Sequence, residues 1–219
     1  MKQQKPRAVI FDLDGTLLDT AQDIGAGANL ALHRSGFPEH PLQAYLPRIG
    51  YGIRSLLRSA CPEGITDAQF EPVTQFYLSY YPEHCTERTV FFPGVPELIQ
   101  ALSARGIPLG ILSNKTEPIL LKICAHYFPE APFRFIRGNN GVRPLKPARE
   151  AGDDLCARLA LAPEAIAFVG DGETDMRFGH AMGFRTIGVS WGYRSEAQLR
   201  EAGADAVAHS AAELLTLLS

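Results

Sequence analysis

The chain has 219 residues, of which 46% are hydrophobic and 21% are charged, and its formal net charge is −3. A chain of this length can bury one large core, or one core that carries a smaller insertion. Its charge argues against nucleic acid as a main partner, and no apolar run approaches the roughly 18 residues of a membrane span.

The first predicted element is a buried strand over the apolar residues Ala8–Phe11. Residues 16–90 then carry apolar residues at helical spacing. The spacing predicts three helices, around Ile24–Leu32, Ile53–Ala60 and Phe70–Tyr81. Thr20, followed three residues later by Asp23, is a capping signal for the first of these helices. We therefore expect an all-helical insertion with hinges near residues 16–18 and 91–94.

From residue 91 onward, apolar runs alternate with helical segments. The runs predict strands at Pro108–Leu112, Ala165–Val169 and Thr186–Val189, and a weaker one at Ala206–Ala208. The segments predict helices at Val95–Arg105, Glu117–Tyr127, Arg149–Leu161, Thr174–Met182 and Ala197–Ala202, and Gly138–Gly141 predicts a loop or tight turn. This alternation is typical of a parallel sheet with helices on both faces. We predict an α/β fold with a Rossmann-like core of residues 1–15 and 91–219, and residues 16–90 as an inserted all-helical cap domain.

Polar residues follow three of the predicted strands. Asp12 and Asp14 come after the first strand, Ser113 follows the run that ends at Leu112, and Asp171 follows the run that ends at Val169. The ligand crevice of an open parallel sheet lies outside the carboxyl ends of its strands, so we expect these side chains to meet. Carboxylates without histidine or cysteine nearby favour Mg²⁺ over zinc or copper. A cation also relieves the repulsion between two acids separated by one residue.

Magnesium with open coordination positions commonly accompanies a phosphate, so Asp12 is a candidate nucleophile toward phosphorus. A carboxylate is ionised at neutral pH and needs no base to attack. Asp14 can protonate the leaving alkoxide and later deprotonate the attacking water. Lys146 is the candidate cation on a phosphate oxygen, and Ser113 and Asn114 can donate hydrogen bonds to phosphate oxygens.

Four ordered motifs carry a family resemblance that spans nearly the whole chain. They are Asp12–Thr16 (DLDGT), Ser113–Lys115 (SNK), Lys146-Pro147 and Gly170–Asp175 (GDGETD). Together they resemble the motifs of the haloacid dehalogenase-like phosphohydrolases. The resemblance implies that Asp12 is the nucleophile and Asp14 the acid/base. It also implies Mg²⁺ ligation by Asp12, the Asp14 carbonyl and Asp171, with Asp175 in support. Lys115 is expected to be structural or peripheral.

The helical insertion resembles the mobile cap of the phosphoglycolate phosphatase-like subgroup, through RIGYGIRSLL and YYPEHCTERTVFFPGVPELIQAL. The resemblance makes hydrolysis of a small phosphate monoester, with 2-phosphoglycolate as the leading substrate, the expected reaction, through an aspartyl-phosphate. A substrate that bears a carboxylate would need a cation from the cap. Among Arg48, Arg54 and Arg58 we select Arg54, because it lies near Gly50 and Gly52. The three arginines are alternatively a solvated helix face.

Two alternatives to a phosphatase stay open. A phosphomutase of the same superfamily would keep its phosphoenzyme until a sugar hydroxyl attacks. A non-catalytic relative that binds a phospho-ligand would be expected to lose a charged motif residue, and none is missing here. Phosphonate cleavage is disfavoured because residues 16–90 contain no lysine for a Schiff base, and halide removal because it needs no metal.

The four cysteines, Cys61, Cys85, Cys124 and Cys156, lie far apart and form no C-x-x-C pair. This pattern predicts reduced thiols and argues against a zinc site. With an N-terminal apolar run too short for a signal peptide, it predicts a cytoplasmic protein. The expected partner is a small phosphorylated metabolite, with neither nucleic acid nor membrane. Cap aromatics such as Tyr77 or Tyr80 leave a homodimer open.

Overall fold

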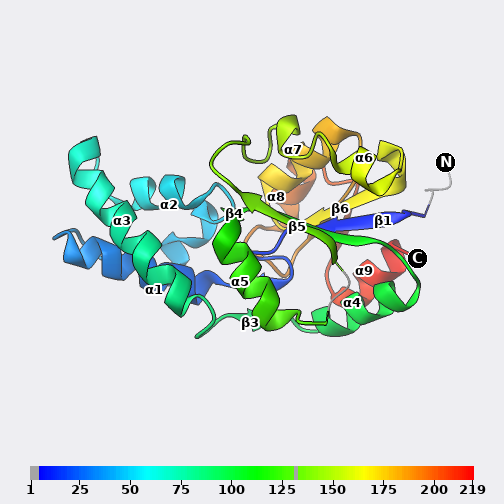
Figure 1. Ribbon diagram of the computed structural model, residues 1–219, viewed down its shortest axis with the longest axis horizontal. Helices are drawn as coiled ribbons and strands as arrows, with labels where there is room; N and C mark the ends of the chain where they lie inside the picture. Colours follow the sequence, from blue (N-terminus) through cyan, green and yellow to red (C-terminus); the bar gives the residue numbers. More distant parts are fainter. Residues whose placement is uncertain (1–4, 131–132) are drawn as a thin grey trace.

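A six-stranded sheet forms the centre of the computed structural model, which describes residues 5–130 and 133–219 (Figure 1). Its strands are β1 (Ala8–Phe11), β4 (Leu109–Thr116), β5 (Phe133–Asn139), β6 (Ile166–Gly170), β7 (Arg185–Val189) and β8 (Ala206–Ala208). They lie in the order β5-β4-β1-β6-β7-β8, and every neighbouring pair is parallel. The predicted parallel α/β architecture is confirmed.

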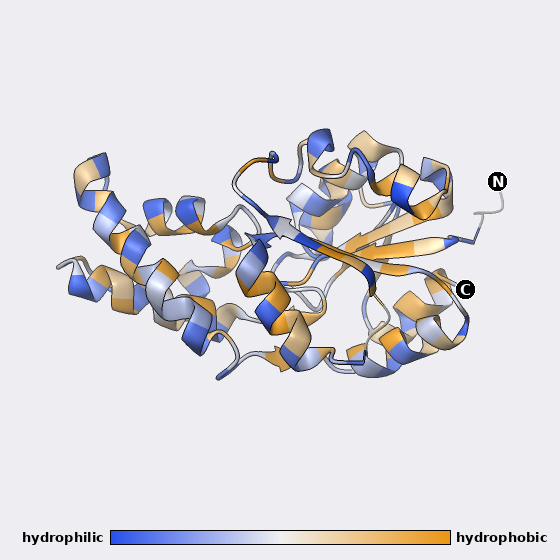
Figure 2. Ribbon diagram, viewed as in Figure 1, coloured by the Kyte–Doolittle hydropathy of each residue, from blue (hydrophilic) through white to orange (hydrophobic). Residues whose placement is uncertain are grey.

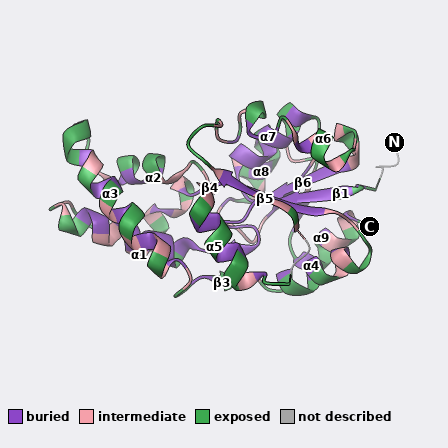
Figure 3. Cartoon of the chain, in the orientation of Figure 1, coloured by how far each residue is buried: buried purple, intermediate pink, exposed green. Residues whose placement is uncertain are grey.

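Helices cover both faces of this sheet (Figure 1). One face carries α4 (Val95–Ala104), α5 (Glu117–Tyr127) and α9 (Ala211–Leu217); the other carries α6 (Leu155–Leu159), α7 (Glu173–Met182) and α8 (Glu196–Glu201). Side chains of a strand alternate between faces, so Val9 and Phe11 join one apolar cluster while Ala8 and Ile10 join the other. The central strands β1 and β6 are therefore apolar and buried along their length (Figures 2 and 3).

Three helices stand beside the sheet, between its first and second strands in chain order (Figure 1). They are α1 (Ala21–Arg34), α2 (Ile53–Ala60) and α3 (Asp67–His84), with single 3₁₀ turns at Leu42–Ala44 and Leu46–Arg48. The chain enters and leaves this group through β2 (Leu18–Asp19) and β3 (Val90–Phe91), which pair antiparallel. Helices α1 and α3 pack together, and Tyr77 is buried between them, so it belongs to the core and not to an exposed surface.

Some elements differ from the prediction. Strand β5 was not predicted, because Arg134 and Arg137 interrupt its apolar pattern, and its last residues fall in the stretch expected to be a loop. The expected helix at Arg149–Leu161 is broken near Gly152 into a 3₁₀ turn, Arg149–Ala151, and the short α6. Helix α9 was also not predicted.

Helix α1 begins directly after Thr20, as the capping signal predicts, but the side chains of Thr20 and Asp23 do not cap it. Thr20 makes no capping hydrogen bond, and its hydroxyl donates instead to Asp14 Oδ1 at 2.6 Å. The Asp23 carboxylate accepts hydrogen bonds from the backbone N–H groups of Arg88 and Thr89. Both side chains therefore stabilise contacts with distant segments, which a local spacing rule does not capture.

The four cysteines are free thiols, as predicted. Among the helices that the structure describes, none combines the length and the apolar character needed to cross a membrane.

Candidate active site

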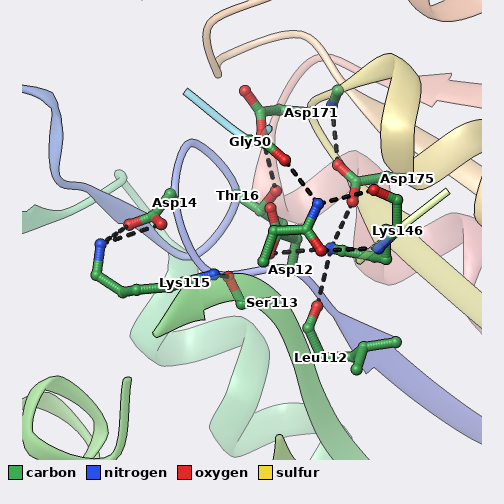
Figure 4. Close-up of polar contacts among 12 residues, drawn as sticks. Asp12, Asp14, Thr16, Gly50, Leu112, Ser113, Lys115, Lys146, Asp171 and Asp175 are labelled. Atoms are coloured by element: carbon green, nitrogen blue, oxygen red, sulfur yellow. Dashed lines mark hydrogen bonds and ion pairs between the residues drawn. The ribbon is translucent and has the colours of Figure 1, made fainter. Parts of the chain in front are cut away.

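The carboxyl ends of β1 and β6 bring three carboxylates together. Asp12 follows β1, Asp171 follows β6, and Asp175 lies in the first turn of α7. One carboxylate oxygen from each residue lies within 4.8 Å of the others, and all three side chains are buried (Figure 4). Parallel pairing of β1 with β6 produces this meeting, because it aligns the ends of the two strands.

Lys146 contacts two of these three carboxylates, those of Asp12 and Asp175. Its Nζ is 3.1 Å from Asp12 Oδ1 and 2.7 Å from Asp175 Oδ1, and it donates to the Leu112 carbonyl at 2.9 Å (Figure 4). Burial by itself would lower the pKa of Lys146, but Asp12 and Asp175 raise it above its ordinary value. The lysine is therefore held as a cation between two acids.

The cluster keeps an excess of negative charge, since one ammonium faces three carboxylates. Burial raises the pKa of Asp12 to about 6, Lys146 opposes that rise, and Asp175 adds to it. Burial and the neighbouring Asp175 raise the pKa of Asp171 well above its ordinary value. Asp12 Oδ1 is buried and, among the residues that the structure describes, accepts no hydrogen bond beyond its ion-pair contact with Lys146. Close, buried, oxygen-only donors with uncompensated charge fit a hard divalent cation such as Mg²⁺.

Local backbone features hold Asp171 and Asp175 in place. Gly15 has φ +81°, and a Cβ there would overlap the Asp171 carboxylate, so the glycine of DLDGT permits the close approach. The Tyr193 N–H donates to Asp171 Oδ2 at 2.8 Å. Asp175 Oδ2 accepts from the Gly172 N–H at 3.0 Å while its Oδ1 contacts Lys146. Asp175 thus caps its helix and also belongs to the cluster.

The Asp14 side chain points away from the cluster, toward Lys115 (Figure 4). Lys115 Nζ lies 2.8 and 3.1 Å from the two Asp14 oxygens, and the Thr20 hydroxyl donates to the same carboxylate. This ion pair is almost completely buried. Lys115 is therefore not peripheral. The feature of the sequence that indicates this is its position directly after Ser113 and Asn114, at the end of β4.

The two residues predicted to donate hydrogen bonds to phosphate, Ser113 and Asn114, lie at the end of β4. Ser113 is buried and faces the site, where its Oγ accepts a hydrogen bond from the Lys115 N–H. Asn114 donates through Nδ2 to the carbonyls of Gly50 and Lys146, and its Oδ1 accepts from the Lys146 N–H, all at 2.8–2.9 Å. Both amide hydrogens of Asn114 are thus engaged with backbone, so in this conformation it positions Lys146 and the helical insertion.

A cavity with an empty volume of about 490 Å³ lies between the helical insertion and the end of β4. Its polar lining residues are Asp12, Asp14, Arg48, Ser113, Asn114, Lys115 and Thr116. Its apolar lining comes from α1, α2, α3 and α5 and the loop before α2, and includes Ile24, Ile49, Ile53, Leu56 and Ile119. The candidate nucleophile and acid/base therefore face the same cavity.

The structure does not bring Arg54 to this cavity. Its guanidinium is exposed and pairs with Glu71 of α3 at 3.0 Å. Ile53, one position earlier, lines the cavity. Consecutive residues of a helix differ in direction by about 100°, so the Arg54 side chain points away from the cavity. The cavity arginine is Arg48, which sits in the turn before α2.

Arg194 links the core to the helical insertion. Its guanidinium donates to the carbonyls of Leu46, Pro47 and Ile49 at 2.7–3.0 Å, and its Nε lies 3.2 Å from the Glu173 carboxylate. No motif in the sequence indicates a role for Arg194. The feature of the sequence that indicates a role is its position after the carboxyl end of β7, because that end lies on the same edge of the sheet as the acids.

Comparisons with known proteins agree with this geometry. The family model for haloacid dehalogenase-like hydrolases matches residues 9–189. The chain is 31% identical to the phosphoglycolate phosphatase of Chromobacterium violaceum, over 97% of this chain and 96% of that protein. It is 30% identical to the N-acetylmuramic acid 6-phosphate phosphatase of Pseudomonas aeruginosa, over 100% and 97%.

A crystal structure of a candidate phosphoglycolate phosphatase from Lactobacillus delbrueckii subsp. bulgaricus superposes with a TM-score of 0.90 at 26% identity. The match covers 98% of this chain and 99% of that one. The chain therefore belongs to the haloacid dehalogenase-like hydrolases, in a phosphoglycolate phosphatase-like group of phosphoric monoester hydrolases.

Proposed function

We propose that this chain is a Mg²⁺-dependent phosphatase that hydrolyses a small phosphate monoester through an aspartyl-phosphate on Asp12. One observation carries the proposal. A buried carboxylate, Asp12, faces the cavity while it contacts the ammonium of Lys146 and lies beside Asp171 and Asp175. Such a carboxylate is a ready nucleophile, and the cation beside it can take up charge on phosphate oxygens.

The residues that would hold Mg²⁺ are Asp12 and Asp171, with the Asp14 backbone carbonyl as a further ligand and Asp175 in support. When bound, the ion would neutralise the acids and the phosphate oxygens, so that anionic nucleophile and anionic substrate can approach.

In the first step, a carboxylate oxygen of Asp12 attacks phosphorus, and the bond from phosphorus to the leaving oxygen breaks. Asp14, as a carboxylic acid, gives its proton to the leaving alkoxide. Water then attacks the phosphorus of the aspartyl-phosphate and gives a proton to Asp14, and the bond to Asp12 breaks to release phosphate. Lys146 and Ser113 hold phosphate oxygens in both steps. For this role the Asp14 side chain exchanges its contact with Lys115 for one with the leaving group.

Residues 16–90 act in this proposal as a mobile cap domain that closes over the substrate and excludes bulk water. The contacts of Arg194 and Asn114 with the loop before α2 support closure at that point. The four free thiols support a reducing, cytoplasmic location.

The best candidate substrate is 2-phosphoglycolate. N-acetylmuramic acid 6-phosphate is the second, because the Pseudomonas aeruginosa relative that carries this name matches the whole chain. Both compounds bear a carboxylate in addition to the phosphate.

A panel of phosphorylated metabolites tests the proposal. We expect Mg²⁺-dependent phosphate release that EDTA abolishes, with a higher kcat/KM for 2-phosphoglycolate than for sugar phosphates. A value below those for sugar phosphates would contradict the substrate. Phosphate transfer between sugar hydroxyls without net release would indicate a phosphomutase. Absence of release from every compound, p-nitrophenyl phosphate included, would favour a binding protein.

Acid is expected to weaken Mg²⁺ binding. Ligand carboxylates must lose their protons to bind the ion, and the pKa of Asp12 is raised to about 6 while that of Asp171 is raised well above its ordinary value. Protons therefore compete as the pH falls through 6, and the Mg²⁺ affinity should drop at least about tenfold from pH 7.5 to pH 5. Calorimetric titration at both pH values measures this change, and equal affinities would contradict the assigned ligands.

A further inference from the structure

Among the described residues, the cavity contains one cation that no carboxylate neutralises. Its two basic lining residues are Arg48 and Lys115. Lys115 is paired with Asp14 at 2.8 Å. Arg48 forms no ion pair with any carboxylate in the described parts of the chain, and its Nη1 is buried without a hydrogen-bond partner.

A second buried polar group on the cavity wall also lacks a partner. The Tyr81 side chain is 1% exposed, and its Oη makes no hydrogen bond within residues 5–130 and 133–219. Buried donors without acceptors are costly to a folded protein, so such groups point to a ligand that supplies acceptor atoms. Asp12 Oδ1, at the proposed centre of reaction, lies in the same cavity and forms an ion pair with Lys146.

The backbone that carries Arg48 is fixed against the core. Arg194 donates to the carbonyls of Pro47 and Ile49, the two neighbours of Arg48, and Asn114 donates to Gly50. These contacts fix the backbone position from which the Arg48 side chain extends, on the insertion side of the cavity. Asp12 lies on the core side, and side chains such as Ile49 and Leu56 contribute an apolar wall.

We propose that Arg48 determines substrate specificity by binding a carboxylate on the leaving group of the substrate. The inference rests on the proposed function, since Asp12 is taken to attack the phosphate of the same molecule. A guanidinium binds a carboxylate through two parallel N–H donors, and its single positive charge matches a single negative one. A second phosphate would bring up to two negative charges against that one cation.

Two matched substrates and a matched variant test this role. The substrates are 2-phosphoglycolate and 2-hydroxyethyl phosphate, which has the same length but no carboxylate. Arg48→Gln should lower kcat/KM for 2-phosphoglycolate by about 10- to 100-fold, mainly through KM, and change that for 2-hydroxyethyl phosphate less than about threefold. Arg48→Lys should restore part of the loss. The control is Arg54→Gln, outside the cavity, which should leave both values within about threefold.

Binding without turnover separates this inference from the proposed function. The probe is 3-phosphonopropionate, a non-hydrolysable analogue of 2-phosphoglycolate, measured by calorimetry with wild-type and Arg48→Gln protein in Mg²⁺. Weaker binding by the variant supports the role of Arg48 even if the wild type hydrolyses nothing. Equal binding by both proteins, or an equal loss of kcat/KM for both substrates, overturns it. Tighter binding of propane-1,3-bisphosphonate than of 3-phosphonopropionate overturns the assignment to a carboxylate.

Discussion

Asp12→Asn is expected to lower kcat by at least about 10⁴-fold for every phosphate monoester that the wild type hydrolyses. The amide has nearly the shape of the carboxylate but carries no charge, so it cannot form an acyl phosphate. The variant should remain folded, because the change removes a buried negative charge from a cluster in which burial raises the pKa of Asp12 to about 6. Steady-state kinetics with 2-phosphoglycolate and p-nitrophenyl phosphate measure the loss.

Two controls make this result specific. Asp153→Asn changes an exposed aspartate on the surface of the α/β domain, and this variant should retain full activity. Asp12→Ala excludes activity from amide that has hydrolysed back to aspartate. Borohydride reduction of wild-type protein during turnover should convert the phosphorylated side chain at position 12 into homoserine, which mass spectrometry detects. Residual activity above about 1% in both variants would contradict the assignment of Asp12 as nucleophile.

Lys146→Met is expected to cost both activity and stability. Loss of the ammonium leaves the buried carboxylates of Asp12 and Asp175 without their cation. Breaking a buried ion pair from one side commonly costs about 3–5 kcal/mol in the free energy of unfolding. Loss of charge stabilisation at the phosphate should lower kcat by about 10²- to 10³-fold.

The stability loss should depend on pH in a defined direction. Without Lys146, the pKa of Asp12 rises further, because the cation that favours its charged form is gone. The folded-state pKa of Asp12 exceeds that of the unfolded chain, so the penalty is present at pH 7.5 and shrinks as the pH falls and Asp12 takes up a proton. Denaturant unfolding without Mg²⁺, at pH 7.5 and pH 5, measures this difference.

The matched control is Lys122→Met, which removes an exposed lysine that pairs with Glu83 at 3.0 Å. An exposed ion pair contributes little to stability. This change should therefore leave kcat unaltered and the free energy of unfolding within about 1 kcal/mol of the wild-type value. A loss of stability in Lys146→Met that is the same at both pH values would show that the destabilisation does not arise from the uncompensated negative charge of the buried cluster.

The sequence alone determined the sheet and the residues at its carboxyl edge. Apolar runs such as Ala8–Phe11 are buried on both faces, and only a parallel sheet covered by helices satisfies them. Parallel strands end at one edge, so acids that follow different strands had to meet there, as Asp12 and Asp171 do. Strand β5 escaped prediction because an edge strand with Arg137 on it does not show the same continuous apolar pattern.

Only the tertiary structure decided which side chains face each other across the cavity. The sequence offered three arginines in the helical insertion, and the helical turn directs Arg54 to Glu71 while the preceding turn leaves Arg48 at the cavity. It likewise could not show that Lys115 would pair with Asp14. The interaction between two charges depends on the distance between them and on their burial. Both depend on how the helical insertion packs against the core, and no local pattern in the sequence indicates that packing.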